Sequence, residues 1–215
     1  MKRIPFALFV LVWIVATGCG GGASHQAAPA SATSPFSHPS SAVVAAFPTS
    51  TTAVPNPAVI PPVIDANYVN AVFRQLNHII GDVTRLDLAA DAVPKQSATD
   101  LRAAFNDPWF NRELTLASES LVEDTSNVRR PPGDRVTSVR QLVSAGPRCI
   151  FAQTVTDYSP VLIRPAPPAA SEYYMLTPKL PGNDPEGVNS TPWAIAYNRV
   201  YTTPTQVPST CPASS

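Results

Sequence analysis

The order of residue patterns in this 215-residue chain predicts an α+β domain, in which two N-terminal helical regions pack on a curved antiparallel sheet. Apolar residues recur at helical spacing between positions 65 and 121, and β-branched and aromatic residues dominate four segments between 135 and 201. Charge gives a third observation, since only Lys2 and Arg3 among the charged residues precede Asp65. A packed domain needs charged groups on its water-facing side, so the domain is predicted at residues 64–203.

The first helix is predicted to begin after Asp65, which is suited to cap it, and to end near Leu88. Its apolar face comprises Tyr68, Val69, Val72, Phe73, Leu76, Ile79, Ile80, Val83 and Leu86. Gly81 weakens this pattern by about 1 kcal/mol relative to alanine. His78 could act as a general base, but a lone helical histidine without an identified partner is more often structural or exposed.

The second helical region follows Pro94. Residues 97–100 (SATD) match a capping box with Asp in place of Glu and open a short turn, and the chain restarts at Asp107-Pro108 with Asp as the cap and Pro at the first helical position. An apolar stripe follows, made of Trp109, Phe110, Leu114, Ala117 and Leu121. Trp109 and Phe110 are interpreted as core residues, with a ligand pocket as the alternative. Glu119 and Glu123 indicate a solvated face rather than a catalytic carboxylate pair, because no apolar flank would raise a pKa there.

Four strand candidates follow a turn at residues 129–134. They are Arg135–Val143, Cys149–Tyr158, Glu172–Thr177 and Trp193–Tyr201. Gly146-Pro147 separates the first two, and residues 161–163 can extend the second as an edge segment after Pro160. The alternating row in the last candidate is expected to pack on the helices; it consists of Trp193, Ile195, Tyr197, Arg199 and Tyr201.

This order of elements, from Asp65 to about Thr203, is similar to that of the NTF2-like family, in which a curved sheet forms a cone around a long N-terminal helix. The resemblance implies either an isomerase- or dehydratase-like enzyme or a non-catalytic binding module. Alternation along the second strand puts Gln153 and Asp157 on one face and Tyr158 on the other. If the first face lines the cone, a desolvated Asp157 would serve as a base.

Residues 1–18 have the properties of an export signal. Lys2 and Arg3 precede an apolar run from Ile4 to Ala16, which is shorter than the roughly 20 residues of a membrane-spanning helix. The run closes with Ala16-Thr17-Gly18-Cys19, which resembles the lipobox of bacterial lipoproteins, with Ala16 where that family usually has Leu or Val. The resemblance implies cleavage before Cys19 and acylation of its sulfur and new N-terminus. The same residues also fit an ordinary cleavage site that would give a secreted protein, and an uncleaved membrane anchor is a third interpretation.

Residues 19–63 are predicted to comprise the lipidated cysteine and a disordered tether. Residues 20–63 carry no charge and contain eight prolines, so neither a helix nor a strand ladder can extend far. As a flexible coil, such a segment reaches roughly 35–40 Å. His25 and His38 lie in this segment and are interpreted as solvent-exposed residues rather than metal ligands.

The two cysteines besides Cys19 are Cys149 and Cys211, and each stands alone in the sequence. In an exported protein such a pair most often forms a disulfide, with free thiols or intermolecular bridges as alternatives. The bond would attach the C-terminal tail, residues 204–215, to the start of the second strand.

The sequence therefore predicts a cell-envelope lipoprotein, anchored on the extracytoplasmic side of the membrane, whose domain is a non-enzymatic binding or assembly module. The expected partner is an envelope protein or a small apolar ligand. No catalytic residue, metal or cofactor is assigned, because no nucleophile–base pair, metal-ligand spacing or phosphate-binding loop occurs. The zero net charge argues against nucleic acid. The alternatives are a small NTF2-like enzyme that uses Asp157 and a secreted structural protein.

Overall fold

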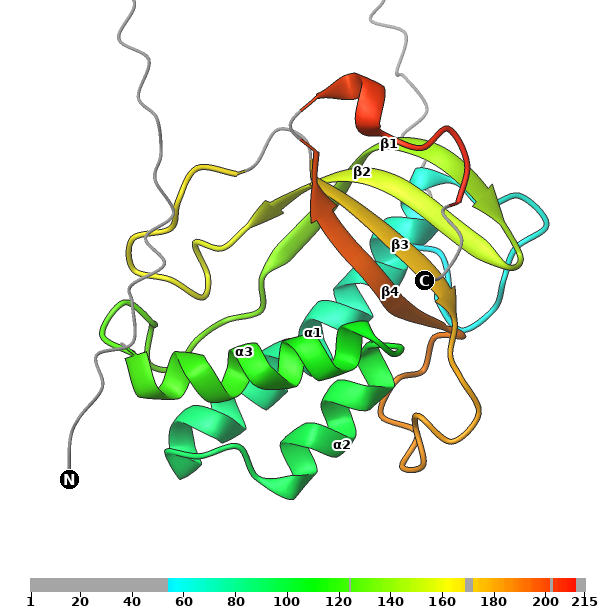
Figure 1. The fold of residues 1–215 in the computed structure, drawn as a ribbon. Coiled ribbons are helices and arrows are strands. Elements are labelled where there is room, and N and C mark those ends of the chain that lie inside the picture. The colour runs from blue at the N-terminus through cyan, green and yellow to red at the C-terminus, as the bar shows by residue number, and fades with distance from the viewer. Residues whose placement is uncertain (1–53, 124, 169–171, 202, 212–215) are drawn as a thin grey trace, which may run out of the picture. The chain divides into compact units, whose positions relative to one another are not determined.

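The computed structural model describes residues 54–123, 125–168, 172–201 and 203–211 (Figure 1). The predicted signal, Cys19 and residues 20–53 of the tether lie outside the described residues. Three α-helices come first, and they are α1 (Ala66–Ala90), α2 (Lys95–Ala104) and α3 (Trp109–Glu123). Four strands follow, β1 (Val136–Gly146), β2 (Cys149–Asp157), β3 (Glu172–Pro178) and β4 (Trp193–Val200), and then the 3-10 helix Pro204–Gln206. This order confirms the predicted α+β class.

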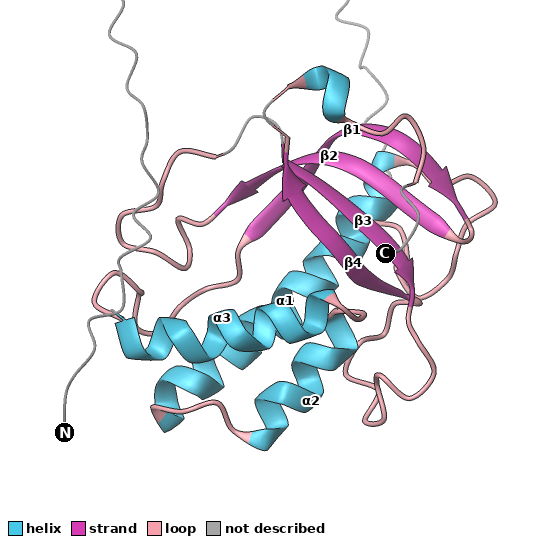
Figure 2. Cartoon of the chain, in the orientation of Figure 1, coloured by secondary structure: helices cyan, strands magenta, loops and turns pink. Residues whose placement is uncertain are grey.

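The strands form one antiparallel sheet in the order β1-β2-β3-β4, so each strand pairs with its neighbour in sequence (Figure 2). Helix α1 runs along the sheet, and α2 and α3 lie beside it (Figure 1). The β1–β2 register shifts twice, between Val139 and Gln141 and between Leu142 and Ser144. Residues 161–163 do not extend the sheet, since Leu162 makes only an isolated bridge with Val128. None of the described helices is long and apolar enough to cross a membrane.

Helix α1 begins where the sequence predicts it to begin. The Asp65 side chain accepts a hydrogen bond of 2.8 Å from the backbone N–H of Tyr68, which satisfies one of the free donors of the first turn. The mid-helix Gly81 has a packing reason, because a Cβ at this position would lie 2.1 Å from the Asp134 Oδ1 atom. Glycine therefore lets the segment before β1 approach the helix closely.

The second helical region begins directly after Pro94, as predicted, but neither of the two predicted side-chain caps is observed. Helix α2 already begins at Lys95 without a side-chain cap, and Ser97 is buried inside the helix. Asp107 also does not cap α3, because its carboxylate accepts hydrogen bonds from the side chains of Arg102 and Asn111 instead of a backbone N–H. In both cases tertiary neighbours determine the position of a polar side chain that local pattern assigns to a cap.

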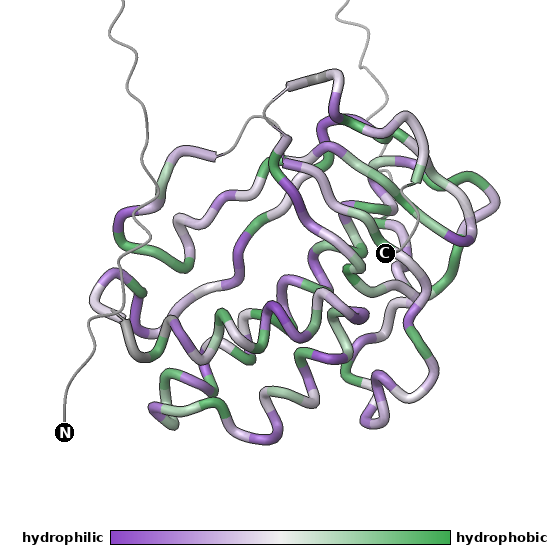
Figure 3. The backbone as a smooth tube through the Cα atoms, viewed as in Figure 1, coloured by the Kyte–Doolittle hydropathy of each residue, from purple (hydrophilic) through white to green (hydrophobic). Residues whose placement is uncertain are grey.

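The main core lies between the helices and one face of the sheet. Its buried side chains come from all three helices and from β2, β3 and β4; the largest are Tyr68, Phe73, Phe105, Tyr174 and Trp193. Hydropathy alternates along the helices, as the apolar spacing in the sequence predicts (Figure 3). The Trp193 indole N–H donates a 2.9 Å hydrogen bond to the Tyr68 hydroxyl, so even the polar edge of this core is paired.

The predicted orientation of β2 is inverted. Ile150 belongs to the helix-facing core, whereas Phe151 lies in a second cluster on the other face of the sheet. The second cluster contains Phe151, Tyr173, Met175 and Tyr201, with Val207 and Cys211 of the C-terminal segment packed against it. Because both faces of the strand are buried, apolar alternation alone does not distinguish the helix side.

The disulfide between Cys149 and Cys211 is present, with the two Cα atoms 6.3 Å apart. It attaches the C-terminal segment to the start of β2, as predicted. Closing a loop of 62 residues stabilises the fold by roughly 4 kcal/mol in the chain-entropy treatment.

The alternating residues from Trp193 to Tyr201, which were predicted to share one face, are also divided between the two faces of the sheet. The register shifts between Met175 and Leu176, which pair with Tyr197 and Ile195. The extra residue, Ala196, puts Trp193 and Ile195 in the helix-facing core and Tyr201 in the second cluster.

Candidate ligand-binding site

A cavity of about 560 Å³ lies between α3 and one end of the sheet. We call it the polar cavity; its lining residues are Trp109, Arg112, Glu113, Leu116, Arg135, Tyr158, Glu172, Asn198, Arg199 and Val200. The strand residues stand at the start of β1 and β3 and at the end of β2 and β4. In an antiparallel sheet these positions meet at the same end, so the topology brings together residues that are far apart in sequence.

Glu172 is a buried carboxylate whose two oxygens are both occupied. The Thr156 hydroxyl donates to its Oε2 atom at 2.7 Å, and the Asn198 side-chain amide donates to its Oε1 atom at 3.1 Å. Thr156 also lies 3.3 Å from the Thr137 hydroxyl on the neighbouring strand. These contacts connect the polar groups on the helix-facing side of the sheet at this end, and each oxygen of Glu172 accepts one hydrogen bond within the protein.

Arg135 provides the positive charge of the cavity floor. Its Nε atom donates a 2.9 Å hydrogen bond to the Asn77 side chain of α1. Among the described residues, no carboxylate lies within ion-pair distance of its guanidinium. Burial alone would lower the pKa of Arg135, but nearby tyrosines and glutamates raise it by more, so the side chain is a permanent cation.

Two buried hydrogen-bond donors near the cavity have no acceptor in hydrogen-bond geometry among the described residues. They are the indole Nε1 of Trp109, which lines the cavity close to Glu113, and the hydroxyl of Tyr174, which lies close to Thr156 and does not line the cavity. Tyr174 is buried and packs its ring edge-to-face on Phe73 at 5.2 Å between centroids, so the hydroxyl cannot turn towards solvent. Burial raises the pKa of Tyr174, with a smaller opposing effect from Arg135, and the hydroxyl therefore keeps its proton.

Glu113 and Tyr158 are the other titratable groups of the cavity. Burial raises the pKa of the Glu113 carboxyl, and Arg135, Arg112 and Trp109 offset only part of this rise. Burial also raises the pKa of Tyr158, with a smaller lowering effect from Arg135. Both groups consequently favour their neutral forms more than they would in water.

The outer wall of the cavity combines aromatic rings with arginines. The Arg112 guanidinium lies 4.6 Å from the centre of the Trp109 ring, and Arg199 lies 5.7 Å from that of Tyr197. Trp109 and Tyr197 contact each other edge-to-face at 5.9 Å. These contacts position Trp109 and two cations at the cavity mouth.

A second, smaller cavity of about 290 Å³ lies on the other side of α3, and Glu113 and Leu116 border both cavities. Its walls are mainly apolar residues of the three helices, among them Ile80, Val83, Leu101, Ala117 and Leu121. The Asp87 carboxylate also lines it, and its Oδ1 atom has no hydrogen-bond partner among the described residues. Burial raises the pKa of Asp87 more than the adjacent Ser97 lowers it.

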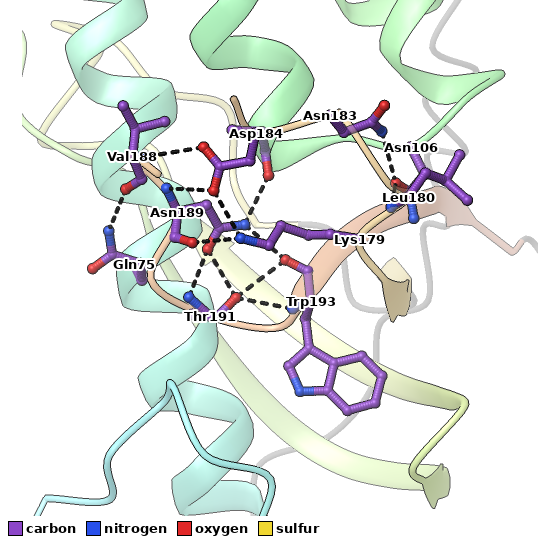
Figure 4. Close-up of polar contacts among 11 residues, drawn as sticks. Gln75, Asn106, Lys179, Leu180, Asn183, Asp184, Val188, Asn189, Thr191 and Trp193 are labelled. Atoms are coloured by element: carbon purple, nitrogen blue, oxygen red, sulfur yellow. Dashed lines mark hydrogen bonds and ion pairs between the residues drawn. The ribbon is translucent and has the colours of Figure 1, made fainter. Parts of the chain in front are cut away.

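A buried polar cluster whose groups are paired within the protein lies at the loop between β3 and β4 (Figure 4). We call it the loop network; its residues are Asn106, Lys179, Asn183, Asp184, Asn189 and Thr191. The Asn189 amide donates to the carbonyls of Ala103 and Trp193 at 2.7 and 2.8 Å, and its oxygen accepts from both the N–H and the hydroxyl of Thr191 at 2.9 Å.

The rest of the loop network is equally well paired. Lys179 forms a 2.7 Å ion pair with Asp184. The Asn106 amide donates to Thr177 and Pro178, and its oxygen accepts from Leu180 and from Asn183. The loop network therefore holds the loop in place and offers nothing for a ligand to bind.

The site residues predicted from sequence are largely different from the residues that line the polar cavity. Asp157, expected to face a concave pocket, is exposed and accepts hydrogen bonds from the backbone N–H and hydroxyl of Ser159. That expectation is wrong because β2 presents the opposite face to the helices. Tyr158, one residue further, lines the cavity instead.

His78 is exposed, as expected, and does have partners, because it lies 2.8 Å from Asp134 and 3.5 Å from Asp82. Of the two aromatic residues, Phe110 joins the core and Trp109 lines the cavity, so each of the two interpretations fits one of them. Glu119 is exposed, and the Glu123 side chain lies outside the described part. His25, His38 and Cys19 also lie outside it.

Arg135, Glu113, Glu172 and Tyr174 were not singled out by the sequence patterns. One signal was available, namely the polar residues that recur on one face of otherwise apolar strands; Thr154, Thr156, Glu172 and Asn198 share this face. Among the described residues, no group of three metal-ligating side chains occurs. No protein-family model, curated protein or solved structure is significantly similar to the chain.

Proposed function

We propose that the chain is a cell-envelope lipoprotein whose α+β domain is a non-enzymatic module that binds a small molecule in the polar cavity. The observation that carries the proposal is the combination of a 560 Å³ cavity with the Arg135 guanidinium, which has no ion-pair partner among the described residues, and with the Trp109 indole N–H, which has no acceptor in hydrogen-bond geometry there. Buried polar groups in folded proteins are nearly always paired, with other protein groups or with bound water, ions or ligands. The loop network shows that a buried polar cluster of this domain can be fully paired, whereas Asp87, Ser97 and Thr154 also have buried polar atoms without a partner among the described residues.

The proposed location follows from the N-terminal residues. The lipobox-like Ala16-Thr17-Gly18-Cys19 would anchor the chain through acyl groups on Cys19, and the charge-free tether would hold the domain away from the bilayer. The disulfide supports an extracytoplasmic location, because such bonds persist in oxidising compartments.

Two observations favour binding over the enzyme hypothesis. Asp157 is exposed and hydrogen-bonded to Ser159, so it lacks the desolvation that would make it a base. Within the polar cavity, Glu172 is held by hydrogen bonds from Thr156 and Asn198, which gives this carboxylate a structural role. A cavity between a helix and the sheet is also compatible with an NTF2-like cone, which we retain as a proposal for the finer fold.

The anchor is tested by replacing Cys19 with serine and fractionating the cells. We expect loss of the acyl mass from the N-terminus and release of the chain from the membrane. Continued membrane retention would favour an uncleaved anchor, and release of the unchanged chain into the medium would favour a secreted protein.

Binding is tested by native mass spectrometry of the chain purified from its own envelope fraction. We expect an additional non-covalent mass that disappears in the variant Trp109→Arg, which fills the cavity mouth with a charged side chain. Capture of an envelope protein without any small-molecule mass would instead support an assembly module.

A further inference from the structure

We infer that the polar cavity binds the carboxylate of a small organic acid, with Arg135 as its main partner and Trp109 as the second donor. This inference rests on the proposed function, since it names the ligand class of the same cavity. It would make the domain a carrier or sensor of such acids at the cell surface. The argument has three parts: the number of unsatisfied donors, the charge balance and the shape of the walls.

The site holds hydrogen-bond donors that are not paired within the protein. Asn77 takes one of the five N–H donors of the Arg135 guanidinium, and no carboxylate of the described residues pairs with this guanidinium. Trp109 Nε1 can only donate, and no acceptor lies in hydrogen-bond geometry to it among the described residues, although the Glu113 carboxyl is close to it. Each oxygen of Glu172 already accepts one hydrogen bond within the protein. A ligand that satisfies the site must therefore bring acceptors.

The charge balance favours an anion with a single charge. Arg112, Arg135 and Arg199 face two acidic residues, of which Glu113 is shifted towards its neutral form by burial. A neutral or cationic ligand would leave the Arg135 charge unpaired in a desolvated site, which costs several kcal/mol. A dianion such as phosphate would meet repulsion from Glu172, whereas the planar guanidinium fork matches one carboxylate.

The walls determine the rest of the ligand. Trp109, Leu116 and Val200 supply apolar surface beside the arginines, and a volume of about 560 Å³ admits a body the size of an aromatic ring. An acid with one carboxylate and a planar or short apolar body fits these features together.

The probes are benzoate, benzamide and benzylamine, which have closely similar shapes and carry a negative, a zero and a positive charge. Each is titrated into the full chain in detergent micelles, and the indole N–H resonances are followed by ¹H–¹⁵N NMR. We expect benzoate to move the Trp109 resonance in a saturable manner, because its unpaired N–H acquires an acceptor. The Trp193 resonance is the internal control, since its N–H is already bonded to Tyr68.

Arg135→Met is expected to weaken benzoate binding about 10- to 100-fold, the loss that corresponds to a charge-assisted hydrogen bond of about 1.5–3 kcal/mol. Arg148→Met, at the exposed turn between β1 and β2, is the matched control and should leave the affinity unchanged. Arg135→Lys keeps the charge without the fork and should give an intermediate loss, which also controls for a folding defect of Arg135→Met.

The possible results test the ligand class and the existence of the binding site separately. If benzamide or benzylamine moves Trp109 with an affinity equal to that of benzoate, or if Arg135→Met leaves benzoate binding unchanged, the ligand class is wrong and the cavity remains a binding site. If none of the three probes moves Trp109 at millimolar concentration, the ligand class is likewise overturned. If the envelope-purified chain also carries no bound small molecule, the proposed function fails as well.

Discussion

The loop network and the polar cavity are both buried polar regions at the sheet, and they differ in how completely they are paired. In the loop network, the amide of Asn189 uses both its donors and its oxygen within the protein (Figure 4). In the polar cavity, the Trp109 N–H has no acceptor in hydrogen-bond geometry and Arg135 has no ion-pair partner among the described residues, and the buried Tyr174 hydroxyl behind the cavity lining is also unpaired there. Pairing within the chain stabilises the fold, whereas unpaired donors beside a cavity provide for a ligand.

The comparison makes its largest prediction for Asn189. Replacing it with alanine removes four hydrogen bonds, and it leaves the Trp193 carbonyl with the Thr191 hydroxyl as its remaining side-chain donor. We expect the free energy of unfolding to fall by about 2–4 kcal/mol. Chemical denaturation measures the change, and Ser190→Ala, at the exposed neighbouring position, is the control. A loss below about 0.5 kcal/mol would mean that the loop network does not stabilise the fold.

Two tyrosines test the same comparison on single hydroxyl groups, one that is paired and one that is not. Tyr68→Phe removes the acceptor of the Trp193 indole N–H and should cost about 1–3 kcal/mol. Tyr174→Phe removes a hydroxyl that has no hydrogen-bond partner among the described residues, so the free energy of unfolding should stay the same or rise by up to about 1 kcal/mol. Thermal unfolding of the two variants checks this difference. Equal losses would show that the Tyr174 hydroxyl is paired after all.

The pH dependence of stability gives a smaller effect at Glu113. Burial raises the pKa of this carboxyl in the folded protein, so the folded state binds more protons than the unfolded state between about pH 4.3 and the raised pKa. The contribution of Glu113 to stability is therefore present at low pH and is lost as the pH rises through this window. Glu113→Gln should lose less stability than the unchanged chain between about pH 4 and pH 7.

The control for this pH series is Glu119→Gln, which removes an exposed carboxylate from the same helix. Denaturation midpoints are measured at each pH for the three proteins. Parallel curves for the Glu113 variant and the unchanged chain would mean that the cavity does not desolvate this carboxyl.

The elements of the fold could be predicted from sequence because their signals are local. Asp65 and the apolar spacing predict α1, and the alternation of β-branched and aromatic residues predicts the four strands. The orientation of β2 could not be predicted, because Phe151 on the outer face is as apolar as Ile150 on the inner face. The tail that covers Phe151 contributes only Val207 and Cys211, and neither carries a strand or helix pattern.

The polar cavity could not be predicted for a different reason. Arg135, Glu113 and Glu172 come from the start of one strand, the middle of a helix and the start of another strand. No spacing in sequence connects them, and only the antiparallel topology brings them together. Tyr158 directly follows the predicted Asp157 in sequence, and it lies on the face of the sheet that borders the cavity.

The account is tested most directly by a crystal structure of the chain purified from its own envelope with its natural ligand retained. We predict density in the polar cavity for a molecule whose carboxylate lies within hydrogen-bond distance of Arg135 and the Trp109 indole nitrogen. A cavity closed by protein side chains, with Arg135 and Trp109 bonded to neighbouring residues, would contradict the central claim that these donors are reserved for a ligand.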